Sequence, residues 1–337
     1  MSQQPTSSSS QAHRHHHPQL TDTVLMVRPV DFAFNEQTAV DNEFQNRIED
    51  KSASQIRDDA LSEFDQSVKN LREAGVQVLV LEAPKTPLST KVPDAVFPNN
   101  WFSTCADGTV FTYPMFTPNR RAEVERLNDV LELLKGANLT VSRVIEMHNV
   151  PSSLALEGTG CMVFDHLNGV VYANLSERCN AKQLEQFVQH TNGAKTELVT
   201  FRTKSSNGKE FYHTNVMLSI GEDFAIVCSA VIVEEDREKV MSALRKTRKT
   251  VIDLTIEQTE KFMCANVLQL CTKTGGKVIV MSDSAYNGFT EEQRNLLEKE
   301  HGKLVLFPIS KTIEKIGGGS ARCMVAEVFN PSQTDVK

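Results

Sequence analysis

The sequence predicts an α/β protein built from repeated modules that close into a ring. Pairs of apolar strands joined by short turns recur four times between residues 100 and 282, and helical segments follow them. A last apolar run, 323–329, has no hairpin partner downstream, and the first apolar run, 24–30, stands unpaired at the other end. Joining the two ends would complete a fifth module. Self-similarity at a fixed period is typical of repeat architectures.

The first part of the chain predicts one strand, one helix and a second strand. The run "VLMVRPV" at 24–30 is typical of a strand. Residues 54–74 have the spacing of a helix that ends at Gly75, and "VQVLVLE" at 76–82 is a strongly apolar strand.

The four hairpins are each predicted from two apolar runs and a turn. The first runs from Asn100 through the turn at 106–108 to "TVFTYP". The others are "CMVFD" with "VVYAN", "NVMLSI" with "FAIVCS", and "NVLQLCT" with "KVIVMS". The Asn168-Gly169 pair in the second is a strong hairpin signal. Helices are expected near 120–135, 180–191, 231–246 and 290–300.

The composition of the chain argues against several classes of function. The 337 residues are 40% hydrophobic and 23% charged, which is typical of a globular protein, and a net charge of -7 argues against nucleic-acid binding. No apolar stretch reaches the ~18 residues that span a bilayer, and the N-terminus lacks the apolar core of a secretory signal. Seven cysteines with no C-x-x-C pair argue against disulfide and zinc frameworks, so we expect a cytoplasmic protein without a metal.

The chain divides into a tail and one domain. Residues 1–22 are polar and rich in serine and glutamine, so we expect a disordered tail, and its four histidines indicate a flexible polar tract more than a metal site. No boundary signal divides residues 23–337, which we therefore interpret as a single domain.

Polar residues recur where the hairpins begin. Asn100 and Glu157 are 57 positions apart, Glu157 and His213 are 56 apart, and His213 and Cys323 are 110 apart, or twice 55. The four residues thus occupy similar places in successive modules. In a closed ring such places converge on one axis, which predicts a site made from residues far apart in the sequence.

Three of these residues suggest nucleophilic catalysis. Cys323 follows Gly317, Gly318 and Gly319, which allow close backbone approach, but a buried structural thiol is an equal alternative. A cysteine nucleophile needs an acid–base partner, and His213 is in register with it. Glu157 lies in an apolar stretch, where its two oxygens could hold a planar group with N–H donors or merely cap a loop.

Further polar residues are candidates for substrate binding. "VPDAVFPNNW" holds Asp94, Asn99 and Asn100, although asparagine in a turn is common. Arg120 and Arg178 stand near helix starts and suit a carboxylate, although ordinary surface arginines are the simpler interpretation of each alone. The segment 30–44 is a candidate for covering the site.

In the order "PDAVFPNNW", "LEGTG", "SERCN", "YHTN" and "GGGSARCM", these stretches resemble the guanidino-group-modifying enzyme superfamily. It includes arginine deiminases, dimethylargininases and glycine amidinotransferases. The resemblance covers residues 24–329, and "VRPVDFAFN", "FPNNWFS" and "YHTNVMLSIG" look most like its citrulline-utilising hydrolases. It implies the five-module α/β-propeller, or pentein, fold, no cofactor, a small amino-acid substrate and a homodimer.

The resemblance also implies roles for single residues. Cys323 would attack the central carbon of a guanidino or ureido group, and His213 would protonate the leaving amine and then activate water. Glu157 would grip the planar group, and Asp94 would face the α-amine. Arg120 and Arg178 would hold the α-carboxylate.

Two positions depart from the arginine-processing pattern. Asn100 and Asn215 stand where arginine deiminases carry aspartates. A guanidinium has no acceptor and favours carboxylates, whereas a ureido carbonyl can accept from an asparagine NH2 group. We therefore expect a citrulline-type substrate. Arginine deimination, hydrolysis of a substituted arginine and amidino transfer remain alternatives, and a rival of another class is an inactive propeller that binds a partner.

Overall fold

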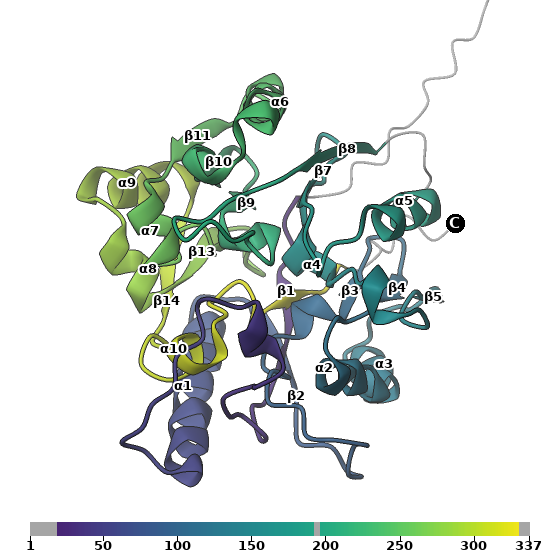
Figure 1. Cartoon of the computed structure of the whole chain (residues 1–337). Coiled ribbons are helices and arrows are strands. Elements are labelled where there is room, and N and C mark those ends of the chain that lie inside the picture. Colours follow the sequence, from purple (N-terminus) through teal and green to yellow (C-terminus); the bar gives the residue numbers. More distant parts are fainter. Residues whose placement is uncertain (1–18, 192–195, 330–337) are drawn as a thin grey trace, which may run out of the picture.

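The computed structural model describes residues 19–191 and 196–329. Fifteen strands in this part form five sheets of three strands each, and the sheets are arranged as the modules of a ring (Figure 1). The predicted five-module α/β-propeller is thereby confirmed.

Four of the five sheets repeat one topology. In each of the four, the first and second strands pair antiparallel as a hairpin, a helical segment follows, and the third strand returns parallel to the second. The sheets are β3 (Phe102–Thr104), β4 (Thr109–Thr112) and β5 (Arg143–Glu146); β6 (Met162–Asp165), β7 (Val170–Asn174) and β8 (Glu197–Phe201); β9 (Leu218–Ile220), β10 (Phe224–Val227) and β11 (Thr250–Asp253); β12 (Leu268–Cys271), β13 (Lys277–Ser282) and β14 (Lys303–Phe307).

The fifth sheet closes the ring. β15 (Ala326–Glu327) pairs antiparallel with β1 (Thr23–Val27), which pairs parallel with β2 (Gln77–Leu81). The predicted joining of the two ends of the chain is therefore confirmed. First strands of neighbouring modules lie side by side, with β15 next to β3, and β9 next to both β6 and β12.

Helices connect the second and third strands within modules. They are α1 (Ala53–Glu73), α2 (Pro118–Arg121), α3 (Leu127–Gly136), α5 (Ala181–His190), α6 (Glu234–Lys246), α8 (Asp283–Gly288) and α9 (Glu291–Leu296). Three further helices precede first strands: α4 (Gly158–Cys161), α7 (Ile256–Glu260) and α10 (Ile313–Gly317). α1 begins at a capping box made by Ser52 and Gln55, and Gly75, with φ +88°, follows its end.

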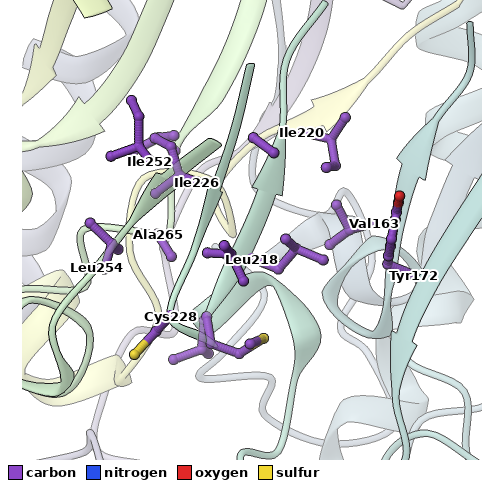
Figure 2. Packing of buried hydrophobic residues seen from close by; sticks show 14 of the residues in the cluster. Val163, Tyr172, Leu218, Ile220, Ile226, Cys228, Ile252, Leu254 and Ala265 are labelled. Atoms are coloured by element: carbon purple, nitrogen blue, oxygen red, sulfur yellow. The ribbon is translucent and has the colours of Figure 1, made fainter. Parts of the chain in front are cut away.

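The apolar core lies between modules as well as beneath the helices. In Figure 2, Val163 and Tyr172 of one sheet face Leu218 and Ile220 of the next, in one buried cluster. Because each hairpin buries apolar side chains against its neighbour, the ring holds the first strands at a fixed separation. Their leading ends are therefore a rigid frame for polar residues.

Three predictions of detail need correction. Residues 19–22 belong to the folded part and not to the tail, because Gln19, Leu20 and Thr21 are buried and the Thr21 hydroxyl donates to the carbonyl of Val328. Residues 1–18 lie outside the described residues. The last strand is shorter than 323–329, because Cys323 lies in a turn before β15. The third strands β5, β8, β11 and β14 were missed, since they are half-exposed edges.

Candidate active site

Five polar residues precede the first strands of the five modules. They are Asn100 before β3, Glu157 before β6, His213 before β9, Asn266 before β12 and Cys323 before β15. All five are at most 3% exposed. The ring brings them together, as the spacing predicted for four of them.

A small cavity lies beside these residues. It is lined by Asn42, Asp94, Phe97, Asn100, Arg120, Arg178, Tyr212, His213, Gly317, Gly319 and Cys323. Its free volume of about 10 Å³ has room for about one water molecule. The structure is therefore a closed form, and an amino acid enters only if part of the wall moves.

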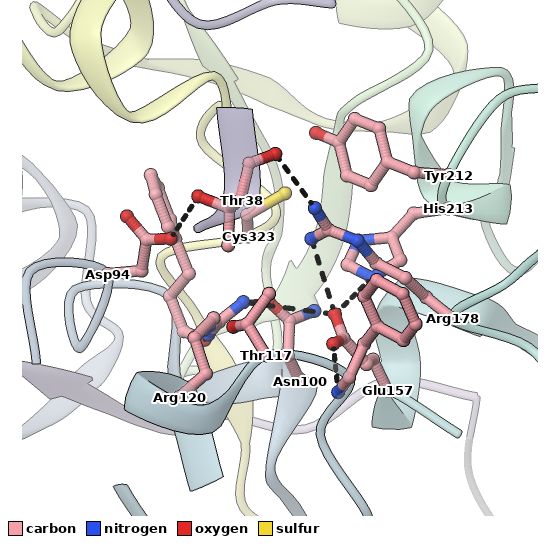
Figure 3. A network of polar contacts seen from close by, with 12 residues as sticks. Thr38, Asp94, Asn100, Thr117, Arg120, Glu157, Arg178, Tyr212, His213 and Cys323 are labelled. Atoms are coloured by element: carbon pink, nitrogen blue, oxygen red, sulfur yellow. Dashed lines mark hydrogen bonds and ion pairs between the residues drawn. The ribbon is translucent and has the colours of Figure 1, made fainter. Parts of the chain in front are cut away.

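His213 and Glu157 form a buried pair. His213 Nε2 lies 2.8 Å from Glu157 Oε2, and the backbone N–H of Phe116 donates to the other carboxylate oxygen at 2.9 Å. Both oxygens of Glu157 are thus occupied by protein groups (Figure 3). In this form the Glu157 carboxylate contacts His213, and its expected role in gripping the substrate stays a prediction.

Two arginines approach the same carboxylate. Arg178 Nη1 is 3.5 Å and Arg120 Nη1 is 3.9 Å from Glu157 Oε2. Burial opposes ionisation, but Arg178, His213 and Arg120 hold the pKa of Glu157 well below its usual range. Burial alone would lower the pKa of His213, yet contacts with Cys161 and Glu157 raise it. The pair therefore favours an imidazolium beside a carboxylate.

A glycine permits this arrangement. A Cβ on Gly160 would lie 2.4 Å from Asn100 Nδ2 and 2.7 Å from His213 Nδ1. Any larger residue would push two of the five polar side chains out of place. The "LEGTG" stretch thus supplies Glu157 and, at Gly160, the small residue that lets Asn100 and His213 of the neighbouring modules lie close to it.

Arg120 is committed to protein partners. It donates to both oxygens of Glu123, to the carbonyl of Phe97 at 3.0 Å and to Asn100 Oδ1 at 2.8 Å. The predicted role in holding a carboxylate is therefore already taken by Glu123 in this form. Arg120 instead fixes the side chain of Asn100.

Asp94 faces the cavity with one free oxygen. Its Oδ2 accepts from Asn35 at 2.7 Å and from Thr38 at 3.0 Å, whereas Oδ1 is buried without a partner among the described residues. Burial raises the pKa of Asp94, against the pull of Arg120. This oxygen is an acceptor that a bound ammonium group could satisfy.

The segment 30–44 supplies Asn42 to the cavity wall and contacts other residues that line the cavity, whereas its expected role as a cover stays a prediction. Asn35 and Thr38 of this segment donate to Asp94. Asp41 of the same segment accepts two hydrogen bonds from Arg178, and the one from Nε to Oδ2 is 2.7 Å long. The Arg178 guanidinium also lies over the ring of Tyr212 at 4.8 Å. In this closed form Asp41 binds the edge of the Arg178 guanidinium that was expected to hold a substrate carboxylate.

Two asparagine amides surround Cys323. Asn266 Nδ2 lies 3.3 Å and Asn215 Nδ2 3.6 Å from Cys323 Sγ. Burial raises the pKa of Cys323, and donors from Ser320, Asn266 and Asn215 together with the charge of Arg322 partly offset that rise. Burial therefore favours the thiol of Cys323 over its thiolate. Burial raises the pKa of Cys105 and Cys264 to about 12, without comparable donors.

Six of the nine predicted residues line this cavity, and Glu157 and Asn215 hydrogen-bond to residues that line it. The exception is Asn99, which is buried but does not line the cavity and whose amide has no partner among the described residues. Sequence reasoning missed Asp41, Tyr212 and Asn266. Of these three, only Asn266 could have been predicted from the sequence, because it lies near the middle of the 110-residue interval between His213 and Cys323.

The described residues hold neither a metal-binding cluster nor a membrane-spanning helix. No three His, Cys, Asp or Glu side chains gather closely enough there to hold a metal ion. No helix in the described ranges has the length and apolar character needed to cross a membrane.

Comparison with known proteins identifies the family. Residues 28–330 match the model of a family described as "N,N dimethylarginine dimethylhydrolase, eukaryotic". The chain belongs to this family. Membership places the protein among hydrolases that cleave carbon–nitrogen bonds outside peptides. No curated protein matches the chain.

Solved structures share the fold. The arginine dihydrolase ArgZ of the cyanobacterial ornithine-ammonia cycle has a TM-score of 0.64 at 16% identity over 92% of this chain. This chain covers 40% of full-length ArgZ but 98% of its N-terminal domain, whose complex with product has a TM-score of 0.66 at 16% identity over 92% of this chain. The DDAH of Pseudomonas aeruginosa, solved with citrulline, has a TM-score of 0.62 at 13% identity over 92% of this chain and 100% of that one.

Proposed function

We propose that the protein hydrolyses the ureido group of a citrulline-type amino acid through a covalent intermediate on Cys323. Asn100, which lines the cavity, carries this proposal. Its Oδ1 accepts from Arg120, and a guanidinium can only donate, so the assignment of the amide is fixed.

The amide NH2 of Asn100 is consequently a buried donor without a partner among the described residues. A ureido oxygen is the acceptor that such a donor needs. A guanidinium offers only donors and would leave this NH2 group unsatisfied, at a cost of about 1–3 kcal/mol.

Each of three residues has a distinct role in the proposed reaction. Cys323 is the nucleophile, because its sulfur borders the cavity and faces two amide donors. His213 is the acid and base, because it lines the same cavity and its pKa is raised. Glu157 is a positioning residue, because both of its oxygens are bound to protein.

The proposed first step breaks the carbon–nitrogen bond to the amino-acid side chain. The thiol proton of Cys323 passes to solvent water, and the sulfur forms a bond to the ureido carbon. The carbon–nitrogen bond then breaks, and the leaving side-chain nitrogen takes a proton from the His213 imidazolium. The products of this half are a diamino acid such as ornithine and a carbamoyl thioester on Cys323.

The second step returns the enzyme. Neutral His213 takes a proton from water, whose oxygen adds to the carbamoyl carbon, and the carbon–sulfur bond breaks with its electron pair on sulfur. The sulfur takes a proton from solvent, which restores the Cys323 thiol beside the His213 imidazolium. The released carbamic acid decomposes to ammonia and carbon dioxide. One water is consumed for each substrate, and no oxidant or cofactor is required.

The α-amino-acid part of the substrate has two candidate partners. Asp94 Oδ1 is the free acceptor for the α-ammonium. Arg178 is the candidate for the α-carboxylate, once Asp41 has left its guanidinium. The closed cavity makes movement of the segment 30–44 part of each turnover.

Hydrolysis of dimethylarginine or arginine is the second candidate. The family description favours it, and the free oxygen of Asp94 is an acceptor that could serve a cation. Under this alternative the Asn100 donor has no partner in the substrate.

An end-point assay separates the candidates. Purified protein and a Cys323→Ser control receive citrulline, arginine and dimethylarginine separately, and amino acids, ammonia and methylamines are quantified. We expect ornithine from citrulline, and none from the control. Citrulline formed from arginine or dimethylarginine would instead establish the second candidate.

A further inference from the structure

We propose that Asn266 is a catalytic residue that stabilises the Cys323 thiolate by donating a hydrogen bond from its side-chain amide. The inference deepens the proposed function, since it names a donor for the nucleophile of that reaction. Asn266 precedes β12, is fully buried and contributes the fourth of the five polar residues around the ring.

The direction of the Asn266 amide is fixed by two backbone groups. The N–H of Arg322 donates to Asn266 Oδ1 at 3.0 Å, and Asn266 Nδ2 donates to the carbonyl of Asn215 at 3.0 Å. A backbone N–H cannot accept and a carbonyl cannot donate, so a flipped amide would lose both bonds.

The second hydrogen of the same NH2 group is therefore available to sulfur. Nδ2 lies 3.3 Å from Cys323 Sγ, and Oδ1 lies 3.6 Å from it. The contact suits both states of the cysteine: the thiol can donate to the oxygen, and the thiolate can accept from the nitrogen. Backbone bonds at both ends of the amide hold this geometry before any substrate arrives.

Of the nearby charges, that of Arg322 also favours the Cys323 thiolate, but the Arg322 guanidinium makes its own hydrogen bonds elsewhere. Arg322 is next to Cys323 in sequence, but its guanidinium donates to the carbonyl of Val325 and to Glu327. The other titratable or charged groups that border the same cavity are Asp94, Arg120, Arg178, Tyr212 and His213. The two arginines and His213 are each paired with a carboxylate, so among the described residues that border the cavity no cation is unpaired.

This arrangement fits a neutral substrate. A cationic guanidinium over the sulfur would itself stabilise a thiolate through its charge. A ureido group carries no charge, so the protein must supply the donors. Asn266 and Asn215 supply them as neutral dipoles in a dry site, where a hydrogen bond to an ion is worth more than in water.

Alkylation of Cys323 tests the inference without any substrate. The full-length protein is treated with iodoacetamide across a pH series, and the peptide that contains Cys323 is quantified by mass spectrometry. In Asn266→Asp an oxygen replaces the donor, and in Asn266→Ser the NH2 group is absent. We expect both variants to be alkylated at Cys323 at least about tenfold more slowly at pH 8, with the midpoint moved upward by about one unit.

Asn174 offers a matched control. It too is fully buried, its Nδ2 donates to the carbonyl of Phe211 and its Oδ1 accepts from Thr203, yet none of its hydrogen bonds involves Cys323. Asn174→Asp and Asn174→Ser should leave the alkylation midpoint of Cys323 unchanged. The inference is overturned if the Asn266 variants keep the wild-type midpoint, or if the Asn174 variants shift it equally.

A measurement on the wild-type protein covers the case in which the variants do not fold. The side-chain amide protons of Asn266, followed by NMR, should titrate with the same midpoint as Cys323 alkylation, and amide protons that stay constant overturn the inference. Loss of citrulline turnover alone leaves the inference intact, because neither readout uses the substrate. If the Asn266 variants shift the alkylation midpoint of Cys323 but the wild-type protein does not turn over citrulline, the proposed function is contradicted and this inference is not.

Discussion

Glu157 Oε2 lies 2.8 Å from His213 Nε2, and the two side chains are 0% and 2% exposed. The carboxylate stays ionised because Arg178 and Arg120 accompany it, and its charge helps to keep His213 protonated. A buried imidazolium that can give its proton to a leaving amine is what the first chemical step needs.

Glu157→Gln should lower kcat on the order of 10²-fold, because the imidazolium loses its counter-charge. The pKa of His213 should fall, so the alkaline limb of the pH–rate profile should move to lower pH. Measuring kcat against pH for both proteins checks this. An unchanged alkaline limb would show that Glu157 does not set the protonation of His213.

Asn100→Asp should reverse the polarity of the cavity wall. Arg120 would keep one carboxylate oxygen, and the other would replace the donor that faces a ureido oxygen. We expect kcat/KM for citrulline to fall by roughly 10- to 100-fold, corresponding to ~1.5–3 kcal/mol.

The same variant should bind arginine more tightly than the wild type does, because an acceptor would then face the guanidinium. Steady-state kinetics with citrulline and inhibition by arginine measure both effects. Equal losses for both ligands would indicate damage to the site instead of a change of preference.

Asp41→Asn should open the closed cavity. The substrate carboxylate would no longer compete with a charged side chain for Arg178, so KM should fall about fivefold, or ~1 kcal/mol, for a pair that is partly exposed. Glu36→Gln is the control, because Glu36 lies in the same segment and the substitution removes only its exposed ion pair with Arg47. A raised KM in Asp41→Asn would mean that Asp41 and Arg178 stay paired around the substrate.

Lys249→Met should destabilise the ring without touching the cavity. Lys249 Nζ lies 3.3 Å from Asp165 Oδ2, both side chains are at most 2% exposed, and the pair joins the second and third sheets in chain order. Its removal leaves a buried carboxylate uncompensated, so the free energy of unfolding should fall by about 3–5 kcal/mol. Urea unfolding measures it, and a loss below ~1 kcal/mol would contradict the expectation.

The sequence alone determined the modules and most of the site. Alternating apolar runs with Gly-containing turns predict hairpins, because strand periodicity and turn chemistry are local properties. The spacing of Asn100, Glu157, His213 and Cys323 then predicted their convergence. The same spacing pointed to Asn266, 53 positions after His213 and 57 before Cys323, but a neutral asparagine carries no chemical signal of its own.

Only the tertiary structure decided what each polar group faces. Nothing local shows that Glu157 contacts His213, 56 positions away, or that Asp41 reaches Arg178 from 137 positions away. The half-exposed third strands likewise gain their pairing from a partner across a helix. Hydrogen bonding and burial depend on neighbours that the ring brings together, and those neighbours are distant in the chain.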